Sequence, residues 1–197
     1  MSSNNETVEK KKLFEFKTIT IVAIGLGAAI FTLLFMFVKI PSPVPETSFQ
    51  TAYGIAGFFG ALFGPIAGAL IAFIGHAISD AVQYGSPWWS WVVASGVSGF
   101  VYGISYKFLR IREGHFNWKS IVIFNVVQII GNVIAWIVVA PVLDILVYKE
   151  PVNLVFTQGA VALVMNSVSC AVIGSVLLSI YAATRMREGS LKKGGDA

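Results

Sequence analysis

Apolar residues fill most of the chain in long runs that short polar segments separate. The first run, Thr18–Val38, is about as long as the roughly 20 residues that a membrane-spanning helix needs. It ends at Lys39 and at a cluster of three prolines, which cannot continue a helix. The next segment, IPSPVPETSFQ at Ile40–Gln50, is therefore predicted to be a stiff, extended loop.

The second run, Thr51–Gln83, is longer than one membrane span requires, and Gly64-Pro65 falls near its middle. A Gly-Pro pair is a turn signal, and proline fits the first turn of a helix. The pattern predicts two short helices, Thr51–Phe63 and Pro65–Gln83, that are joined by a tight turn.

The rest of the chain repeats the same alternation of apolar runs and polar breaks. The predicted helices are Trp88–Tyr106, Ser120–Val142 and Leu154–Ala182, and the predicted loops are Lys107–Lys119 and Leu143–Asn153. This gives an all-α membrane protein with six transmembrane helices. Residues 18–182 form the membrane domain, between an N-terminal tail (1–17) and a C-terminal tail (183–197).

Composition supports a membrane protein. Of the 197 residues, 56% are hydrophobic and only 12% are charged, against about 25% charged in soluble domains. The net charge of +4 does not indicate nucleic-acid binding, because the basic residues lie at the ends of apolar segments. The single cysteine, Cys170, excludes an internal disulfide. The lipid bilayer is thus the expected surrounding.

The basic residues also predict the orientation. Twelve of the 14 Lys and Arg residues fall on one side of the six-helix arrangement, and only Lys39 and Lys149 fall on the other. The positive-inside rule places both termini in the cytoplasm. A single tilted helix over Thr51–Gln83 would move the basic loop Lys107–Lys119 outside, so the charge pattern favours the two short helices. The twelve are Lys10, Lys11, Lys12, Lys17, Lys107, Arg110, Arg112, Lys119, Arg185, Arg187, Lys192 and Lys193.

Polar residues in the third predicted helix are candidates for ligand binding. His76, Asp80 and Gln83 share one helix face, because they are spaced i, i+4, i+7. Polar groups at membrane depth are costly and need partners. Two interpretations stay open: Asp80 holds His76 in a structural hydrogen bond, or the residues bind the polar edge of a ring.

A second polar stripe follows the fifth predicted helix. Asn125 is expected to join helices, whereas Asn132 and Trp136, further toward the outer face, are expected to contact a ligand. Asn166 on the sixth helix could face them, either as a ligand contact or as a contact between helices.

Aromatic residues gather at the start of the fourth predicted helix. Trp88, Trp89 and Trp91 point to different sides of a helix, so at least one is expected to face inward. An inward indole can stack on a flat heteroaromatic ligand, although these residues could also form only an aromatic belt at the membrane interface. The predicted binding set is completed by Gln50, Tyr53 and Tyr84.

Enzyme motifs are weak. Gly96-Val97-Ser98-Gly99 matches the G-x-S-G of intramembrane serine proteases, but His115, the only later histidine, lies in a loop. His76 with Asp80 lacks a third metal ligand. The sequence has no phosphate-binding loop G-x-x-x-x-G-K-[ST], so ATP hydrolysis by that route is not expected. We expect a protein that is not an enzyme and that uses no metal or cofactor.

Small residues spaced four apart mark places where helices approach. Ala23 and Gly27 form the best candidate for a surface that meets a partner, because the first helix is otherwise uniformly apolar.

Together these features resemble the substrate-binding S components of energy-coupling factor (ECF) vitamin transporters. The run FGPIAGALIAFIGHAISD and the Ala/Gly-rich first helix carry the likeness, and IGHAISDAVQYGSPWWSW is similar to the riboflavin-type subfamily. The resemblance implies a multi-pass protein of a bacterial plasma membrane. It further implies a vitamin bound outside, under the loop Ile40–Gln50, and association with a coupling subunit through Ala23 and Gly27. Two cytoplasmic ATPases would hydrolyse the ATP.

The expected function is capture of a vitamin-sized heterocycle for uptake. Riboflavin is the first expectation, with pyridoxine, hydroxymethylpyrimidine and thiamine-like molecules as alternatives. The uncharged to weakly acidic outer lining suits a neutral or cationic ring better than a multiply anionic one. A self-sufficient secondary transporter, which usually shows internal repeats, and a non-transporting membrane scaffold are the other hypotheses.

Overall fold

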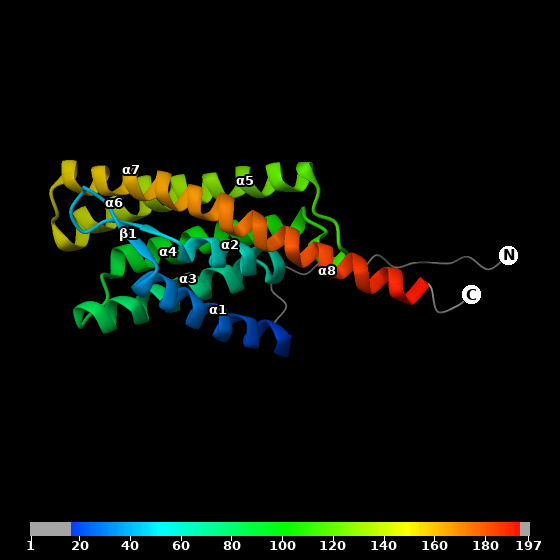
Figure 1. Ribbon diagram of the computed structural model, residues 1–197. Helices are drawn as coiled ribbons and strands as arrows, with labels where there is room; N and C mark the ends of the chain where they lie inside the picture. The colour runs from blue at the N-terminus through cyan, green and yellow to red at the C-terminus, as the bar shows by residue number, and fades with distance from the viewer. Residues whose placement is uncertain (1–16, 194–197) are drawn as a thin grey trace.

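The structure is a computed structural model that describes residues 17–193, with side chains described through residue 185. The predicted N-terminal tail, except Lys17, and residues 194–197 lie outside it. Six helical segments of the described chain lie side by side, and successive segments run in opposite directions (Figure 1). The first four are α1 (Thr18–Phe37), α2 (Ala52–Phe63), α3 (Pro65–Tyr84) and α4 (Trp89–Ile104). The fifth is one long helix made of α5 (Trp118–Val133), η3 (Ile134–Val139), α6 (Ala140–Leu143) and η4 (Asp144–Tyr148). The sixth is one long helix made of α7 (Val152–Ser169), η5 (Cys170–Gly174) and α8 (Ser175–Lys193). Two short turns, η1 (Ser105–Lys107) and η2 (Ile111–Glu113), lie between α4 and α5.

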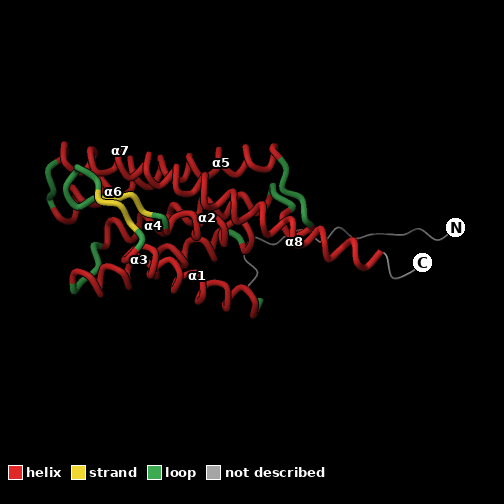
Figure 2. The backbone as a smooth tube through the Cα atoms, viewed as in Figure 1, coloured by secondary structure: helices red, strands yellow, loops and turns green. Residues whose placement is uncertain are grey.

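The segment after α1 is a β-hairpin rather than the predicted extended loop. Strands β1 (Lys39–Pro41) and β2 (Ser48–Gln50) pair antiparallel, with Ile40 opposite Phe49. Figure 2 shows this hairpin, in yellow, at one end of the bundle, which we call the hairpin end. The start of α1 and the end of α8 point to the opposite end, the terminal end (Figure 1).

The predicted turn at Gly64-Pro65 is confirmed. Gly64 adopts φ 96° and ψ 179°, a conformation that residues with a side chain rarely adopt. Its N–H donates to the carbonyl of Gly60 at 2.8 Å, which ends α2, and Pro65 begins α3. The sequence therefore places this reversal within one residue of its position in the structure.

Four helices of the described chain are long and apolar enough to cross a membrane: Thr18–Phe37, Pro65–Tyr84, Trp118–Tyr148 and Val152–Arg185. Helix α2 has only 12 residues and α4 has 16. An α-helix rises about 1.5 Å per residue, so α2 covers well under the roughly 30 Å of a bilayer core. The described part of the chain is helical apart from the hairpin, the connecting turns and one isolated β-bridge between Arg110 and His115. Six complete membrane crossings remain a prediction.

Two predicted helix ends were wrong. The fifth helix continues to Tyr148 instead of ending at Val142, so most of the predicted loop Leu143–Asn153 is helical. The last helix continues past Ala182 to Lys193. In the fifth helix the turns widen to π-helical geometry in η3, just before Pro141, whose ring has no N–H to donate.

Glycines bring α3 and α4 into backbone contact. A Cβ added at Gly68 would lie 2.2 Å from the carbonyl oxygen of Gly99, which is closer than real Cβ atoms approach. Small residues let helix backbones pack this closely in membrane proteins. The α3 and α4 backbones therefore touch where Gly68 meets Gly99.

The small residues of α1 divide between two faces. Ala23 is buried, and a Cβ added at Gly27 would lie 2.7 Å from Cδ1 of Ile71 on α3. Both residues serve packing inside this chain, in contrast to the partner-facing role expected for them. The exposed face of α1 instead carries Gly25 and Ala29.

We predict that Gly68→Ala destabilises the protein because its methyl group must push α3 away from α4. Overpacking of this kind costs about 1–3 kcal/mol. The measurement is the midpoint of thermal unfolding in detergent. Gly25→Ala is the matched control, since no atom lies within 4 Å of its Cβ, and it should leave the midpoint unchanged or raise it. Equal midpoints for Gly68→Ala and wild type would contradict the close packing.

Candidate functional site

A cavity of about 670 Å³ lies at the hairpin end, between the hairpin and residues of all six helical segments. This volume is within the range of pockets that bind small molecules. Nine of the predicted binding residues line it: Gln50, Tyr53, His76, Asp80, Tyr84, Trp88, Trp91, Trp136 and Asn166. The structure thus brings together residues from β2, α2, α3, the start of α4, η3 and α7.

His76 and Asp80 form the pair that their spacing suggests. His76 Nε2 lies 3.4 Å from Asp80 Oδ1, and its Nδ1 lies 2.6 Å from the Ser95 hydroxyl, which also meets the Tyr53 hydroxyl at 2.7 Å. The other Asp80 oxygen accepts from the Trp88 backbone N–H at 3.0 Å. Both residues also line the cavity, so the pair and a ligand contact are compatible.

Gln83, the third member of that stripe, does not line the cavity. Its Oε1 accepts from Lys39 Nζ at 2.7 Å, and its amide donates to Ser79. Gln83 therefore joins the end of α3 to the hairpin. The hairpin has a second attachment on the other side of the cavity, where Gln158 Nε2 donates to the Pro45 carbonyl at 3.2 Å.

Asp144 is the residue that the sequence analysis missed as a site residue. It is only 1% exposed, and its two carboxylate oxygens accept from Trp88 Nε1 at 2.8 Å and Trp91 Nε1 at 2.6 Å. The Ser90 hydroxyl donates to it as well. A carboxylate inside an apolar run of the fifth helix was the available signal, because a charge at that depth needs partners.

Trp136 lines the cavity, whereas Asn132 lies behind it. Asn132 is fully buried, and its Oδ1 accepts from Trp136 Nε1 and from the Tyr102 hydroxyl, each at 2.8 Å. Its amide donates to Gln128. The ligand contact expected of Asn132 therefore has no counterpart in the cavity lining: Asn132 orients the indole that lies there.

The three indoles at the start of α4 differ in position. Trp91 stacks on Trp136 with ring centroids 5.5 Å apart, and Trp88 packs on Tyr148 at 4.6 Å. Trp89 points elsewhere, being 50% exposed and 6.2 Å from the Phe73 ring. Like Asn132, Trp89 is absent from the lining of the cavity.

Two buried acceptors in the lining have no hydrogen-bond partner among the described residues. They are Gln50 Oε1, at the end of β2, and Asn166 Oδ1, on α7. Buried polar groups in proteins are normally paired, because an unpaired one costs about 1–3 kcal/mol. Both acceptors are therefore unsatisfied polar atoms of residues that line the cavity.

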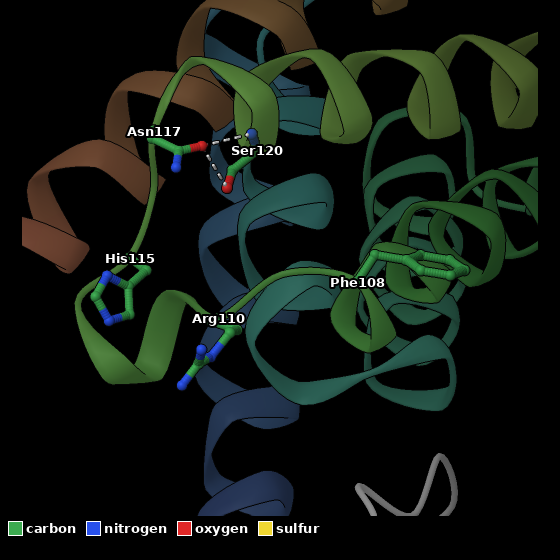
Figure 3. Close-up of a pocket in the computed structure, with 5 residues that line it drawn as sticks. All are labelled: Phe108, Arg110, His115, Asn117 and Ser120. Atoms are coloured by element: carbon green, nitrogen blue, oxygen red, sulfur yellow. Dashed lines mark hydrogen bonds between the residues drawn. The ribbon is translucent and has the colours of Figure 1, made fainter.

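A second, smaller hollow of about 270 Å³ lies at the terminal end (Figure 3). Its polar groups are largely engaged already: Asn117 caps α5 by accepting from the Ser120 N–H at 3.1 Å, and Arg110 pairs with Glu113. In Figure 3 the side chains of Phe108 and Arg110 point in different directions. This hollow lacks the convergent groups of the larger cavity.

Comparison with known proteins identifies one family. The family model "ECF-type riboflavin transporter, S component" matches residues 15–183. Among curated relatives, a UPF0397 protein of Streptococcus gordonii is 50% identical over 93% of this chain and 99% of its own length. A UPF0397 protein of Exiguobacterium is 52% identical, covering 90% and 97%. A third, from Lactobacillus acidophilus, is 47% identical, covering 88% and 94%. No solved structure matches the chain.

We predict that Asp144→Ala loosens the hairpin end, because two indole N–H groups and one hydroxyl lose their acceptor. Each unpaired buried donor costs about 1–3 kcal/mol, so the thermal unfolding midpoint in detergent should fall clearly. Tryptophan emission should shift to longer wavelength as water reaches Trp88 and Trp91. Glu150→Ala is the control, since it removes a carboxylate of the same cavity that accepts no side-chain hydrogen bond among the described residues. Identical midpoints and spectra for both variants would refute this role of Asp144.

Proposed function

The chain belongs to the ECF-type riboflavin transporter S component family, and we propose that it captures a small heterocyclic vitamin at the outer face of a bacterial membrane for ATP-driven uptake. The family is one of transporter subunits and not of enzymes, and the apolar helices fit a multi-pass membrane protein. The observation that carries the proposal is the cavity at the hairpin end, where three indoles and several polar groups converge.

The cavity suits a flat ring system. Trp91 and Trp136 lie stacked in its wall, Trp88 lies beside them, and aromatic rings add about 0.5–1.5 kcal/mol per pair beyond the area they bury. Polar groups around them can fix the orientation of a ring. Riboflavin is the first candidate, because the family description names it. Pyridoxine, hydroxymethylpyrimidine and thiamine-like molecules are the alternatives, because they are also small heterocyclic rings with polar groups.

We place the hairpin end outside the cell and both termini in the cytoplasm. The basic residues Lys107, Arg110 and Arg112 lie in the segment between α4 and α5, and Lys119 lies in the first turn of α5; this segment is at the terminal end (Figure 1). The positive-inside rule assigns such a segment to the cytoplasm. In this orientation the cavity faces the source of the vitamin.

Energy for uptake comes, in this proposal, from a membrane coupling subunit and two cytoplasmic ATPases. The sequence has no phosphate-binding loop of its own, which fits a division of labour. Docking of the coupling subunit on α1 remains the proposal, but its small residues are Gly25 and Ala29 rather than the buried Ala23 and Gly27. No atom lies within 4 Å of a Cβ built on Gly25, so a partner helix can approach there.

A pair of neighbouring tryptophans tests the site. Trp88→Ala removes an indole from the cavity lining, whereas Trp89→Ala removes one that lies outside it. We predict saturable binding of one vitamin by the purified, ligand-stripped protein, about tenfold or more weaker in Trp88→Ala and unchanged in Trp89→Ala. Quenching of tryptophan fluorescence by riboflavin, pyridoxine, thiamine and hydroxymethylpyrimidine measures it.

The alternative functions predict other results, in this binding experiment and in an uptake experiment with vesicles. Absence of binding across the panel by the folded protein would favour the non-transporting scaffold. Uptake into vesicles without ATPases, driven by an ion gradient, would favour a secondary transporter. Equal loss of affinity in both tryptophan variants would place the ligand elsewhere.

The docking face has a matched pair of variants as well. Ala29→Leu enlarges an exposed residue on α1, and Ala160→Leu makes the same change on the exposed side of α7. Because close helix contact needs small residues, we predict that Ala29→Leu abolishes co-purification with the coexpressed coupling subunit and ATPases. Ala160→Leu should co-purify normally, and both variants should bind vitamin like wild type. Normal co-purification of Ala29→Leu would exclude this face.

A further inference from the structure

Carboxylates outnumber basic side chains in the lining of the cavity at the hairpin end. Four carboxylates line it, and Lys39 is its one basic side chain of the lysine or arginine type among the described residues. Lys39 Nζ is bonded to the neutral Gln83 amide. The four carboxylates are Glu46, Asp80, Asp144 and Glu150.

Two of these carboxylates are deeply buried without a lysine or arginine partner in the described part of the chain. Asp80 is 4% exposed and Asp144 is 1% exposed. The donors to Asp144 are two indoles and a hydroxyl, all neutral, and Asp80 receives one backbone N–H and faces His76. Buried charges are normally paired, because burial without a counter-charge is costly. Even with His76 protonated, negative groups outnumber positive ones in the lining.

The neutral groups of the lining also favour a cationic ligand over an anionic one. The indole N–H groups of Trp88 and Trp91 are used by Asp144, and that of Trp136 is used by Asn132. The three indoles can therefore offer a ligand only their ring faces, which attract cations. The two unpaired buried atoms of the lining, Gln50 Oε1 and Asn166 Oδ1, are both acceptors. Hydrogen-bond donors on a ligand could satisfy them.

We propose that the cavity selects a positively charged aromatic heterocycle, whose cationic nitrogen lies against the indole faces near Asp80 and Asp144 and whose N–H groups meet Gln50 and Asn166. This rests on the proposed function, because it specifies the charge of the molecule that the cavity captures. It ranks a thiazolium or pyridinium cation above the uncharged ring system of riboflavin.

Thiamine and thiochrome test the charge and the N–H groups together. Thiamine carries a permanent thiazolium charge and an amino group, and thiochrome, its ring-closed derivative of similar size, has neither. With ligand-stripped wild-type protein in detergent, isothermal titration calorimetry should give thiamine an affinity about tenfold to a hundredfold higher than thiochrome, as expected for interactions with charged groups. This comparison needs no variant, so misfolding cannot obscure it.

Carboxylate variants locate the effect. Asp80→Asn keeps the size of the side chain and should weaken thiamine binding about tenfold or more while leaving thiochrome unchanged. Glu113→Gln removes the same charge at the terminal end and should change neither. Equal or tighter binding of thiochrome or riboflavin would overturn the charge inference and leave vitamin capture standing. Failure of thiamine, thiochrome, riboflavin and pyridoxine alike to bind the folded protein would overturn both.

Discussion

The Asp144 carboxylate accepts hydrogen bonds from three residues at the start of α4, and the walls of the cavity depend on them. The carboxylate fixes the rotation of the Trp88 and Trp91 indoles, and Trp91 then stacks on Trp136. A charged acceptor strengthens each of these bonds relative to a neutral one. The segment that joins α3 to α4 is thus tied to the far end of the fifth helix by one side chain.

Behind this first layer, a second set of buried hydrogen bonds supports the same wall. Asn132 receives the Trp136 indole N–H and the Tyr102 hydroxyl on a single oxygen, while its amide bonds to Gln128. Asn132, Tyr102 and Gln128 do not line the cavity. They therefore act by holding the Trp136 indole in position. Such networks rigidify a structure when every member is satisfied. The aromatic surface offered to a ligand is accordingly preset.

Sequence reasoning succeeded where the information is local and failed where it depends on partners from distant segments. The turn at Gly64-Pro65 was predictable because both residues favour it by themselves. The continuation of the fifth helix past Val142 was not, because Asp144 looks like a loop residue until its partners on α4 are known. On α1, spacing alone cannot separate the buried Gly27 from the exposed Gly25, since only the position of α3 decides which face packs.

The site has two parts that are attached in different ways: the indole wall on the helices and the hairpin. The Trp88 and Trp91 indoles are held by the Asp144 carboxylate and the Trp136 indole by Asn132, whereas the hairpin is fastened by Lys39 to Gln83 and by Gln158 to the Pro45 carbonyl. A neutral bond such as that of Gln158 contributes about 0.5–1.5 kcal/mol net, whereas a bond to a charged group, such as that of the Lys39 ammonium, contributes about 1.5–3 kcal/mol. The aromatic wall is thus held by partners on the helices, whereas single side-chain bonds attach the hairpin to α3 and α7.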